Sequence, residues 1–131
     1  FQLINNDFET RMYKTDPKIV QQILINIISN AIKFTQESEL IKGEVRVTYT
    51  SNTSHVIISI EDTGIGISSH DMELLFNDFT QVENVMQKKH KGTGLGLSLS
   101  KKMAVLLDGD LTLESEGLGH GSKAVFQLKI L

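Results

Sequence analysis

Residues 91–98 read Lys-Gly-Thr-Gly-Leu-Gly-Leu-Ser, and the three alternating glycines lead directly into a helical pattern of apolar residues. Glycine accepts positive φ angles and lets a backbone come close to a ligand. The free N–H groups at the start of the following helix carry a partial positive charge that suits phosphate. The spacing matches neither the Walker phosphate loop nor the dinucleotide-binding fingerprint. This stretch alone therefore indicates phosphate binding without identifying the ligand.

Composition limits the class of protein. The chain has 131 residues, 40% of them hydrophobic and 22% charged, which predicts one globular domain over residues 1–131. A formal net charge of −3 disfavours a nucleic-acid partner, and the absence of cysteine excludes disulfides and thiolate chemistry. No apolar run approaches the roughly 18 residues of a membrane-spanning helix. Because the sequence begins within an apparent strand, we expect a piece of a longer protein, whose parent can still be a membrane sensor. We expect the domain itself to be cytoplasmic.

Three segments have helical periodicity. Asp16 and Pro17 are a typical cap and first residue for a helix that continues to about residue 33. A short helix is predicted over residues 71–79 and a longer one over residues 98–107. The residues of this last helix that we expect to face the core are Leu99, Met103, Leu106 and Leu107.

Alternation of apolar and polar residues predicts the strands. They fall in residues 1–5, 10–13, 44–50, 56–60, 111–113 and 123–130. Val45, Val47 and Tyr49 should share the half-buried face of one strand, which pairs with the next through the turn at 51–54. About three helices packed on a mixed, mostly antiparallel sheet form an α/β two-layer sandwich.

One polar stripe stands out on the first helix. Gln22, Asn26, Asn30 and Lys33 recur at helical spacing beside the apolar stripe. The stripe is either a solvated face or a ligand site. Asparagine is a poor helix former, its amide oxygen suits Mg²⁺, and a lysine one turn further can reach a phosphate.

An acidic residue followed by glycines forms a second candidate site. Asp62 is expected at the end of a strand, with Gly64 and Gly66 after it. A carboxylate in a pocket can accept a hydrogen bond from an exocyclic amine such as adenine N6, and the glycines would let a flat base lie against the backbone. An ordinary turn has the same composition, so the motif alone is weak.

Two further features have ordinary explanations. The basic run at 88–91 is either solvated or steers a polyphosphate toward the glycine loop. None of the histidines has metal-ligand spacing or a catalytic relay, so we expect surface positions for His55, His70, His90 and His120.

Taken in order, the motifs closely resemble the ATP-binding catalytic domain of sensor histidine kinases, in the superfamily of gyrase, the large heat-shock chaperones and MutL-type repair ATPases. The matching segments are Asn26-Ile-Ile-Ser-Asn30-Ala-Ile-Lys33-Phe34-Thr35, Asp62-Thr-Gly-Ile-Gly66-Ile67, Leu75-Phe-Asn-Asp-Phe79-Thr-Gln81, Gly92-Thr-Gly-Leu-Gly96-Leu97 and Gly119-His-Gly-Ser122. The resemblance implies a Bergerat-type fold with ATP and Mg²⁺ as cofactors.

The resemblance also implies a role for each matching position. Asn26, Asn30 and Lys33 would be catalytic, with Asn30 as the Mg²⁺ ligand. Asp62 would bind adenine N6, residues 79–91 would form a mobile lid, and the glycines at 92, 94 and 96 would hinge it. The implied nucleotide-binding residues are Asn30, Lys33, Phe34, Asp62, Gly64, Gly66, Ile67, Phe79, Lys91, Gly92, Thr93, Gly94, Leu95, Gly96, Leu97 and Ser122.

Asn26 separates branches of this superfamily. ATPase branches carry glutamate there, whereas an asparagine amide cannot act as a general base. The resemblance therefore implies slow hydrolysis and transfer of the γ-phosphoryl group to a histidine on a helical dimerisation domain, expected before Phe1. The implied partners are that domain in a homodimeric parent and a response regulator or attached receiver, because Phe-x-x-Phe-x-Gln resembles hybrid kinases. A superfamily ATPase and a nucleotide-binding regulatory module are the alternatives.

Overall fold

The computed structural model describes residues 12–36, 42–77 and 96–130. Its elements, in chain order, are α1 (Pro17–Gln36), β1 (Val45–Ser51), β2 (His55–Asp62), α2 (Ser69–Asn77), α4 (Gly96–Leu106), β3 (Asp110–Glu114) and β4 (Ser122–Lys129). The predicted strand at 1–5 lies outside the described residues. Met12 and Tyr13, the described end of the strand predicted at 10–13, are not in a strand, so this part of the prediction is wrong.

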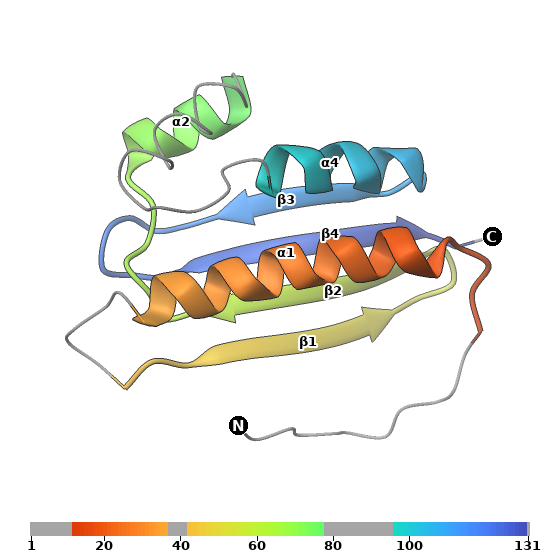
Figure 1. Cartoon of the computed structure of the whole chain (residues 1–131), viewed down its shortest axis with the longest axis horizontal. Helices are drawn as coiled ribbons and strands as arrows, with labels where there is room; N and C mark the ends of the chain where they lie inside the picture. Colours follow the sequence, from red (N-terminus) through yellow and green to blue (C-terminus); the bar gives the residue numbers. More distant parts are fainter. Residues whose placement is uncertain (1–11, 37–41, 78–95, 131) are drawn as a thin grey trace.

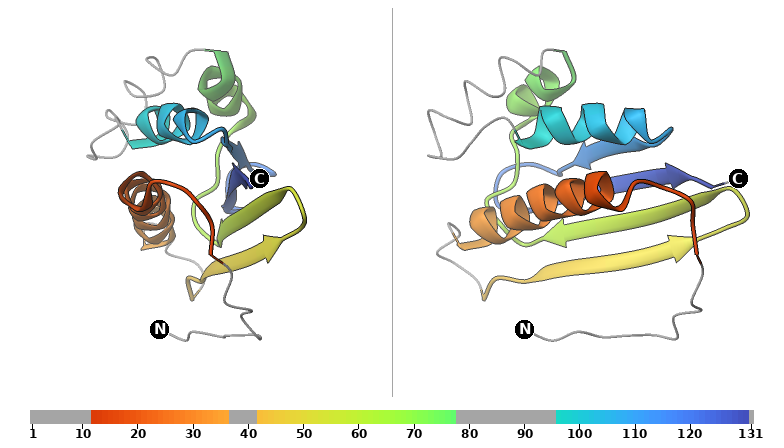
Figure 2. Two further views of the ribbon diagram at one scale, coloured as in Figure 1. Left: turned by 90° about the vertical axis from the view of Figure 1, so that its right-hand side faces the viewer. Right: turned by 45° about the vertical axis from the view of Figure 1, so that its right-hand side comes forward.

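The strands form one sheet in the order β1-β2-β4-β3, and every pairing among them is antiparallel. Helices α1 and α4 lie side by side on one face of this sheet (Figure 1). The end-on view shows the two layers, with α2 beyond the β3 edge and no helix of the described residues over the opposite face (Figure 2). The predicted α/β two-layer sandwich is confirmed.

The core lies between the two helices and the sheet. Phe126 of β4 is completely buried at its centre, together with Ile23 of α1 and Ile60 of β2. Burying a side chain of this size contributes about 1.5–3 kcal/mol. The other buried apolar residues are Ile27, Ala31, Val56, Ala104, Leu111, Ala124 and Leu128.

Helix α1 begins as predicted. The Asp16 side chain accepts hydrogen bonds from the backbone N–H groups of Lys18 and Ile19, at 2.9 and 3.3 Å. These bonds satisfy donors that would otherwise lack partners at the helix start. The helix continues to Gln36, slightly past the expected end at about residue 33.

Helix α4 turns a different face to the core from the one predicted. Ser100 and Ala104 are fully buried, whereas Leu99 and Leu106 are 48% and 76% exposed. The expectation that these two leucines face inward is wrong, while Met103 and Leu107 do pack against the core. Because α4 contacts α1 and β3 together, small side chains occupy the crowded interior position.

An ion pair joins α4 to β3. The Lys101 ammonium donates hydrogen bonds to the Asp110 carboxylate and to the Leu111 carbonyl oxygen. The hydrogen bond from Lys101 lowers the pKa of the Asp110 carboxyl below its ordinary value. The side of α4 that carries Lys101 therefore faces β3, which leaves Leu99 and Leu106 outside.

Strand β1 has the predicted alternation but little cover. Val47 and Tyr49 pair with Ile60 and Ile58, so their side chains share the face that α1 covers elsewhere. They are nevertheless 51% and 36% exposed, because α1 lies over the middle of the sheet rather than over β1 (Figure 1).

Among the described residues, no helix is both long enough and apolar enough to span a membrane.

The turn after α4 contains a strained residue. Asp108, two residues after the end of the helix, has a φ of 54°, a conformation that glycine usually supplies. At the next position, a Cβ on Gly109 would lie 2.2 Å from the Gln127 carbonyl oxygen. The positive φ therefore falls on Asp108, whereas the position that must lack a side chain is the next residue, Gly109.

We predict that Asp108→Gly stabilises the protein by about 1 kcal/mol, because glycine adopts positive φ without the steric penalty of a Cβ. Gly109→Ala should destabilise it, since the new methyl group meets backbone. Urea unfolding monitored by circular dichroism measures both changes. A lower midpoint for Asp108→Gly would show that the aspartate side chain outweighs the strain.

Candidate functional site

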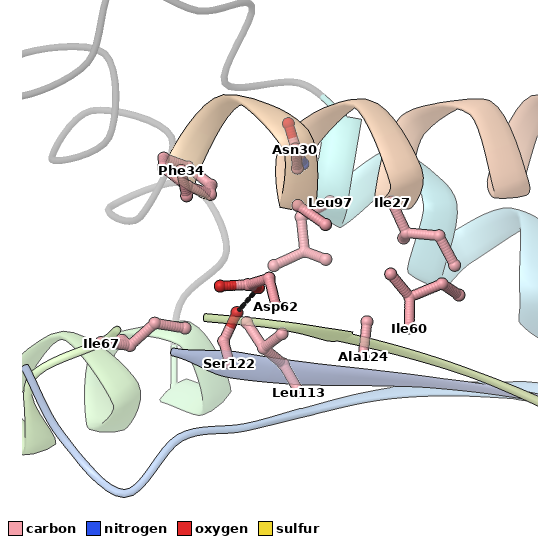
Figure 3. A pocket seen from close by; sticks show the side chains of 11 residues that line it. Ile27, Asn30, Phe34, Ile60, Asp62, Ile67, Leu97, Leu113, Ser122 and Ala124 are labelled. Atoms are coloured by element: carbon pink, nitrogen blue, oxygen red, sulfur yellow. Dashed lines mark hydrogen bonds between the residues drawn. The ribbon is translucent and has the colours of Figure 1, made fainter. Parts of the chain in front are cut away.

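A small cavity, partly open to solvent, lies between α1 and the sheet (Figure 3). Asn30 and Phe34 border it from α1, and Asp62 and Ser122 border it from the ends of β2 and β4. The remaining lining is apolar and comes from Ile27, Ala31, Ile60, Ile67, Leu97, Leu113 and Ala124. An apolar cavity with a few polar groups is typical of a small-molecule site.

Asp62 is the buried polar group on the sheet side of this cavity. Its position at the end of β2 was predicted, and the register places it opposite Ser122. The Ser122 hydroxyl donates to Oδ2 at 2.5 Å, and the Gly64 N–H donates to Oδ1 at 2.9 Å. Because a carboxylate can accept about four hydrogen bonds, these two fix its orientation and leave capacity for a ligand donor.

The glycines after Asp62 permit close backbone contacts. A Cβ at Gly64 would lie 2.6 Å from the Phe34 carbonyl oxygen, and one at Gly66 would lie 2.1 Å from that of Gly117. Gly66 also has a φ of 70°, which disfavours other residues. The loop is therefore pressed against the end of α1 on one side and against the β3–β4 connection on the other.

Ser115 and Gly121 were not among the predicted site residues. The Ser115 hydroxyl accepts the Ile67 N–H at 3.0 Å and donates to the Gly121 carbonyl oxygen at 2.7 Å. Gly121 has a φ of 67°, and a Cβ there would lie 1.9 Å from the Asp62 carbonyl oxygen. Glycines at 117, 119 and 121 repeat the alternation of the 92–96 loop, so this signal was available in the sequence.

The two asparagines of the polar stripe lie beside α4, whereas Gln22 is exposed. The Asn26 Nδ2 donates to the Ser100 hydroxyl at 3.0 Å, and Gln22 Nε2 donates to the Asn26 Oδ1 at 3.3 Å. A Cβ on Gly96 would lie 3.8 Å from Asn26 Cγ and 4.0 Å from Asn30 Nδ2. The first residue of α4 therefore adjoins both asparagines, which argues against a merely solvated face.

Lys33 lies at the edge of this arrangement. Its ammonium is 5.8 Å from the centre of the Phe34 ring, within the range of a cation–π contact. Lys33 does not line the cavity, whereas Phe34 does. A positive charge held beside the cavity suits an anionic ligand that extends out of it.

The structure brings together six of the predicted residues around one cavity, namely Asn30, Phe34, Asp62, Ile67, Leu97 and Ser122. Gly64 and Gly66 shape its loop, while Asn26, Lys33 and Gly96 lie next to it without lining it. The predicted residues Phe79, Lys91, Gly92, Thr93, Gly94 and Leu95 lie outside the described residues.

The described residues contain no cluster of three or more His, Cys, Asp or Glu side chains that could hold a metal ion. His70 and His120 are exposed, as expected, and His55 is partly buried and hydrogen-bonded to the Ser54 hydroxyl at 2.7 Å. A neutral amide ligand such as Asn30 fits Mg²⁺ only when phosphate oxygens and water complete its coordination.

The buried carboxylate, the glycine loops and the asparagine helix define an ATP-binding domain, and comparison with known proteins agrees. The sequence profile described as "Histidine kinase-, DNA gyrase B-, and HSP90-like ATPase" matches residues 15–131. The chain belongs to this family. The predicted resemblance to the ATP-binding domain of a histidine kinase is confirmed.

Similar curated proteins are sensor kinases. The chain is 39% identical over 115 residues to "Sensor protein GacS" of Pseudomonas syringae pv. syringae, covering 88% of this chain. It is 38% identical over 111 residues to "Circadian input-output histidine kinase CikA" of Synechococcus elongatus, covering 85%. It is 40% identical over 116 residues to "Hybrid signal transduction histidine kinase B" of Dictyostelium discoideum, covering 86%. The matches cover 13%, 14% and 6% of those three proteins, respectively.

We predict different costs for alanine at two glycines of the β3–β4 connection. Both Gly119 and Gly121 have positive φ, at 81° and 67°, but only Gly121 has backbone within contact distance of an added Cβ. Gly119→Ala should cost about 1–2 kcal/mol of folding free energy from strain alone. Gly121→Ala should cost about 1–3 kcal/mol more, because Asp62 must shift. Equal unfolding midpoints in urea would contradict the close packing at Asp62.

Proposed function

We propose that this domain binds Mg-ATP and presents the γ-phosphoryl group to a histidine on a separate helical dimerisation domain. The observation that carries the proposal is the Asp62 carboxylate, which two protein donors hold in a fixed orientation at the wall of an apolar cavity. Membership of the family supports ATP as the nucleotide.

The cavity suits adenine better than guanine. The free acceptor capacity of Asp62 can take a hydrogen bond from the exocyclic amine of adenine. Guanine presents a carbonyl oxygen at the corresponding position, which a carboxylate repels. Phe34, Ile67 and Leu97 provide apolar surface for the faces of the ring.

The phosphates would extend toward the space between α1 and α4. Asn30 borders the cavity there, and its amide oxygen would be the protein ligand for Mg²⁺. When bound, this ion would neutralise charge on the phosphate oxygens. Lys33 would contact phosphate, and the N–H groups at the start of α4 would stabilise its negative charge.

Asn26 would direct the chemistry toward transfer rather than hydrolysis. Its amide cannot remove a proton from water, so attack by water would remain slow. The acceptor would be an imidazole nitrogen, which forms a bond to the γ-phosphorus as the bond to ADP breaks. The chain would contribute by holding the nucleotide in position and neutralising its charge.

The partners follow from the same proposal. The histidine would belong to a dimerisation domain of the parent protein, which we propose to be a homodimer. A response regulator or an attached receiver would accept the phosphoryl group next; the relative named a hybrid kinase supports the attached form. We place the domain in the cytoplasm, also where the parent is a membrane sensor.

Asp62→Asn should weaken ATP binding about 10- to 100-fold, since it removes a charged hydrogen-bond acceptor. The matched control is Glu61→Gln, because Glu61 is the preceding residue of β2 and instead forms an ion pair with Lys123 at 2.9 Å. Isothermal titration with ATP and GTP measures affinity and base preference, and thermal unfolding checks the fold. Unchanged ATP affinity in a folded Asp62→Asn protein would refute the adenine assignment.

Asn30→Ala tests the metal assignment. We expect weaker ATP binding in the presence of Mg²⁺ and unchanged binding in excess EDTA, because the lost group acts only through the ion. Ser29→Ala is the control, since Ser29 is an exposed neighbour whose hydroxyl donates to the Asn26 carbonyl oxygen at 3.0 Å. Equal affinity of Asn30→Ala and wild type for Mg-ATP would exclude Asn30 as the ligand.

A further inference from the structure

Ser100 is a polar residue in an unexpected place. It lies on the face of α4 that enters the core and is completely buried, next to the equally buried Ala104. A buried hydroxyl lowers stability unless it has a hydrogen-bond partner. Its partner is the Asn26 side chain of α1, which donates to the Ser100 Oγ at 3.0 Å across a separation of 74 residues.

Two hydrogen bonds hold the Asn26 amide in place. The two ends of an asparagine amide have similar shapes but opposite hydrogen-bonding roles. Ser100 accepts from Nδ2, and Gln22 donates to Oδ1 at 3.3 Å. The amide oxygen of Asn26 therefore retains one free acceptor position. Asn26 and Asn30 belong to the same polar stripe of α1.

The same contact joins α4 to the phosphate side of the site. Helix α4 starts at Gly96, and the Cβ position of Gly96 lies within 4.0 Å of side-chain atoms of both Asn26 and Asn30. Ser100 lies one turn further along the helix. A hydrogen bond at this point holds the first turn of α4 in register with the asparagine stripe.

We propose that Ser100 is a positioning residue for phosphoryl transfer, acting through Asn26. Its hydroxyl holds the Asn26 side chain between α1 and α4 and keeps the start of α4 beside Asn26 and Asn30. The inference rests on the proposed function, because it assigns the orientation of a group within that site. Ser100 itself touches neither the nucleotide nor the reacting atoms.

A double-mutant cycle in the full-length protein that contains this chain tests the inference. Autophosphorylation from Mg-ATP is measured for wild type, Ser100→Ala, Asn26→Ala and the double variant. We expect Ser100→Ala to lower kcat about five- to tenfold with KM for ATP within about twofold, because the adenine contacts are untouched. In the Asn26→Ala background, the same change should lower kcat no further.

Thr35→Val is the matched structural control. Thr35 is also buried, and its hydroxyl donates to the Ala31 carbonyl oxygen at 2.7 Å without contacting Asn26. Its effect on kcat should be the same with and without Asn26. Ser100→Cys enlarges the side chain slightly and weakens the acceptor, so its kcat should lie between those of wild type and Ser100→Ala. It replaces Ser100→Ala in the cycle if the alanine variant does not fold.

The outcomes separate the two proposals. Independent, multiplicative losses from Ser100→Ala and Asn26→Ala would overturn the positioning role while leaving the proposed function intact. Wild-type kcat in Ser100→Ala would do the same. Failure of the wild-type protein to bind Mg-ATP in titration would instead refute the proposed function, and with it the role assigned here.

Discussion

The Asp62 carboxylate, buried at the end of β2, sets the conditions that the surrounding structure must meet. A buried charge without partners would cost several kcal/mol, so donors must be supplied from nearby. The β2–β4 register supplies the Ser122 hydroxyl, and the turn supplies the Gly64 N–H. Side chains are excluded where the backbone must approach, at Gly64 beside Phe34 and at Gly121 beside Asp62 itself.

The site and the core are built from the same side chains. Ile27, Ala31, Ile60 and Ala124 belong to the buried cluster and also line the cavity. The apolar stripe of α1 therefore sets both the spacing of the two layers and the width of the pocket. The asparagines of the polar stripe on the same helix lie beside α4 instead, so the proposed base-binding surface and the proposed phosphate-binding surface lie on different sides of one helix.

Features that depend on neighbouring residues could be predicted from the sequence, whereas features that depend on tertiary packing could not. The Asp16 cap and the position of Asp62 at a strand end depend on neighbouring residues only, and both were predicted correctly. The inward face of α4 depends on the distance to α1 and β3, so hydrophobicity alone wrongly placed Leu99 and Leu106 inside. The bridging role of Ser115 depends on two loops meeting in space, which no local pattern encodes.

The order of the strands has a consequence for how the chain folds. β4 is the last described strand in sequence, yet it lies between β2 and β3, and the Asp62–Ser122 bond joins residues 60 positions apart. Closing a loop of this length costs conformational entropy, which slows the formation of such distant contacts. Until β4 is in place, β2 has an unpaired edge open to other chains and the pocket lacks one wall. A complete pocket is therefore a property of the finished fold. If the proposed function holds, nucleotide present during synthesis would selectively stabilise molecules that have inserted their central strand.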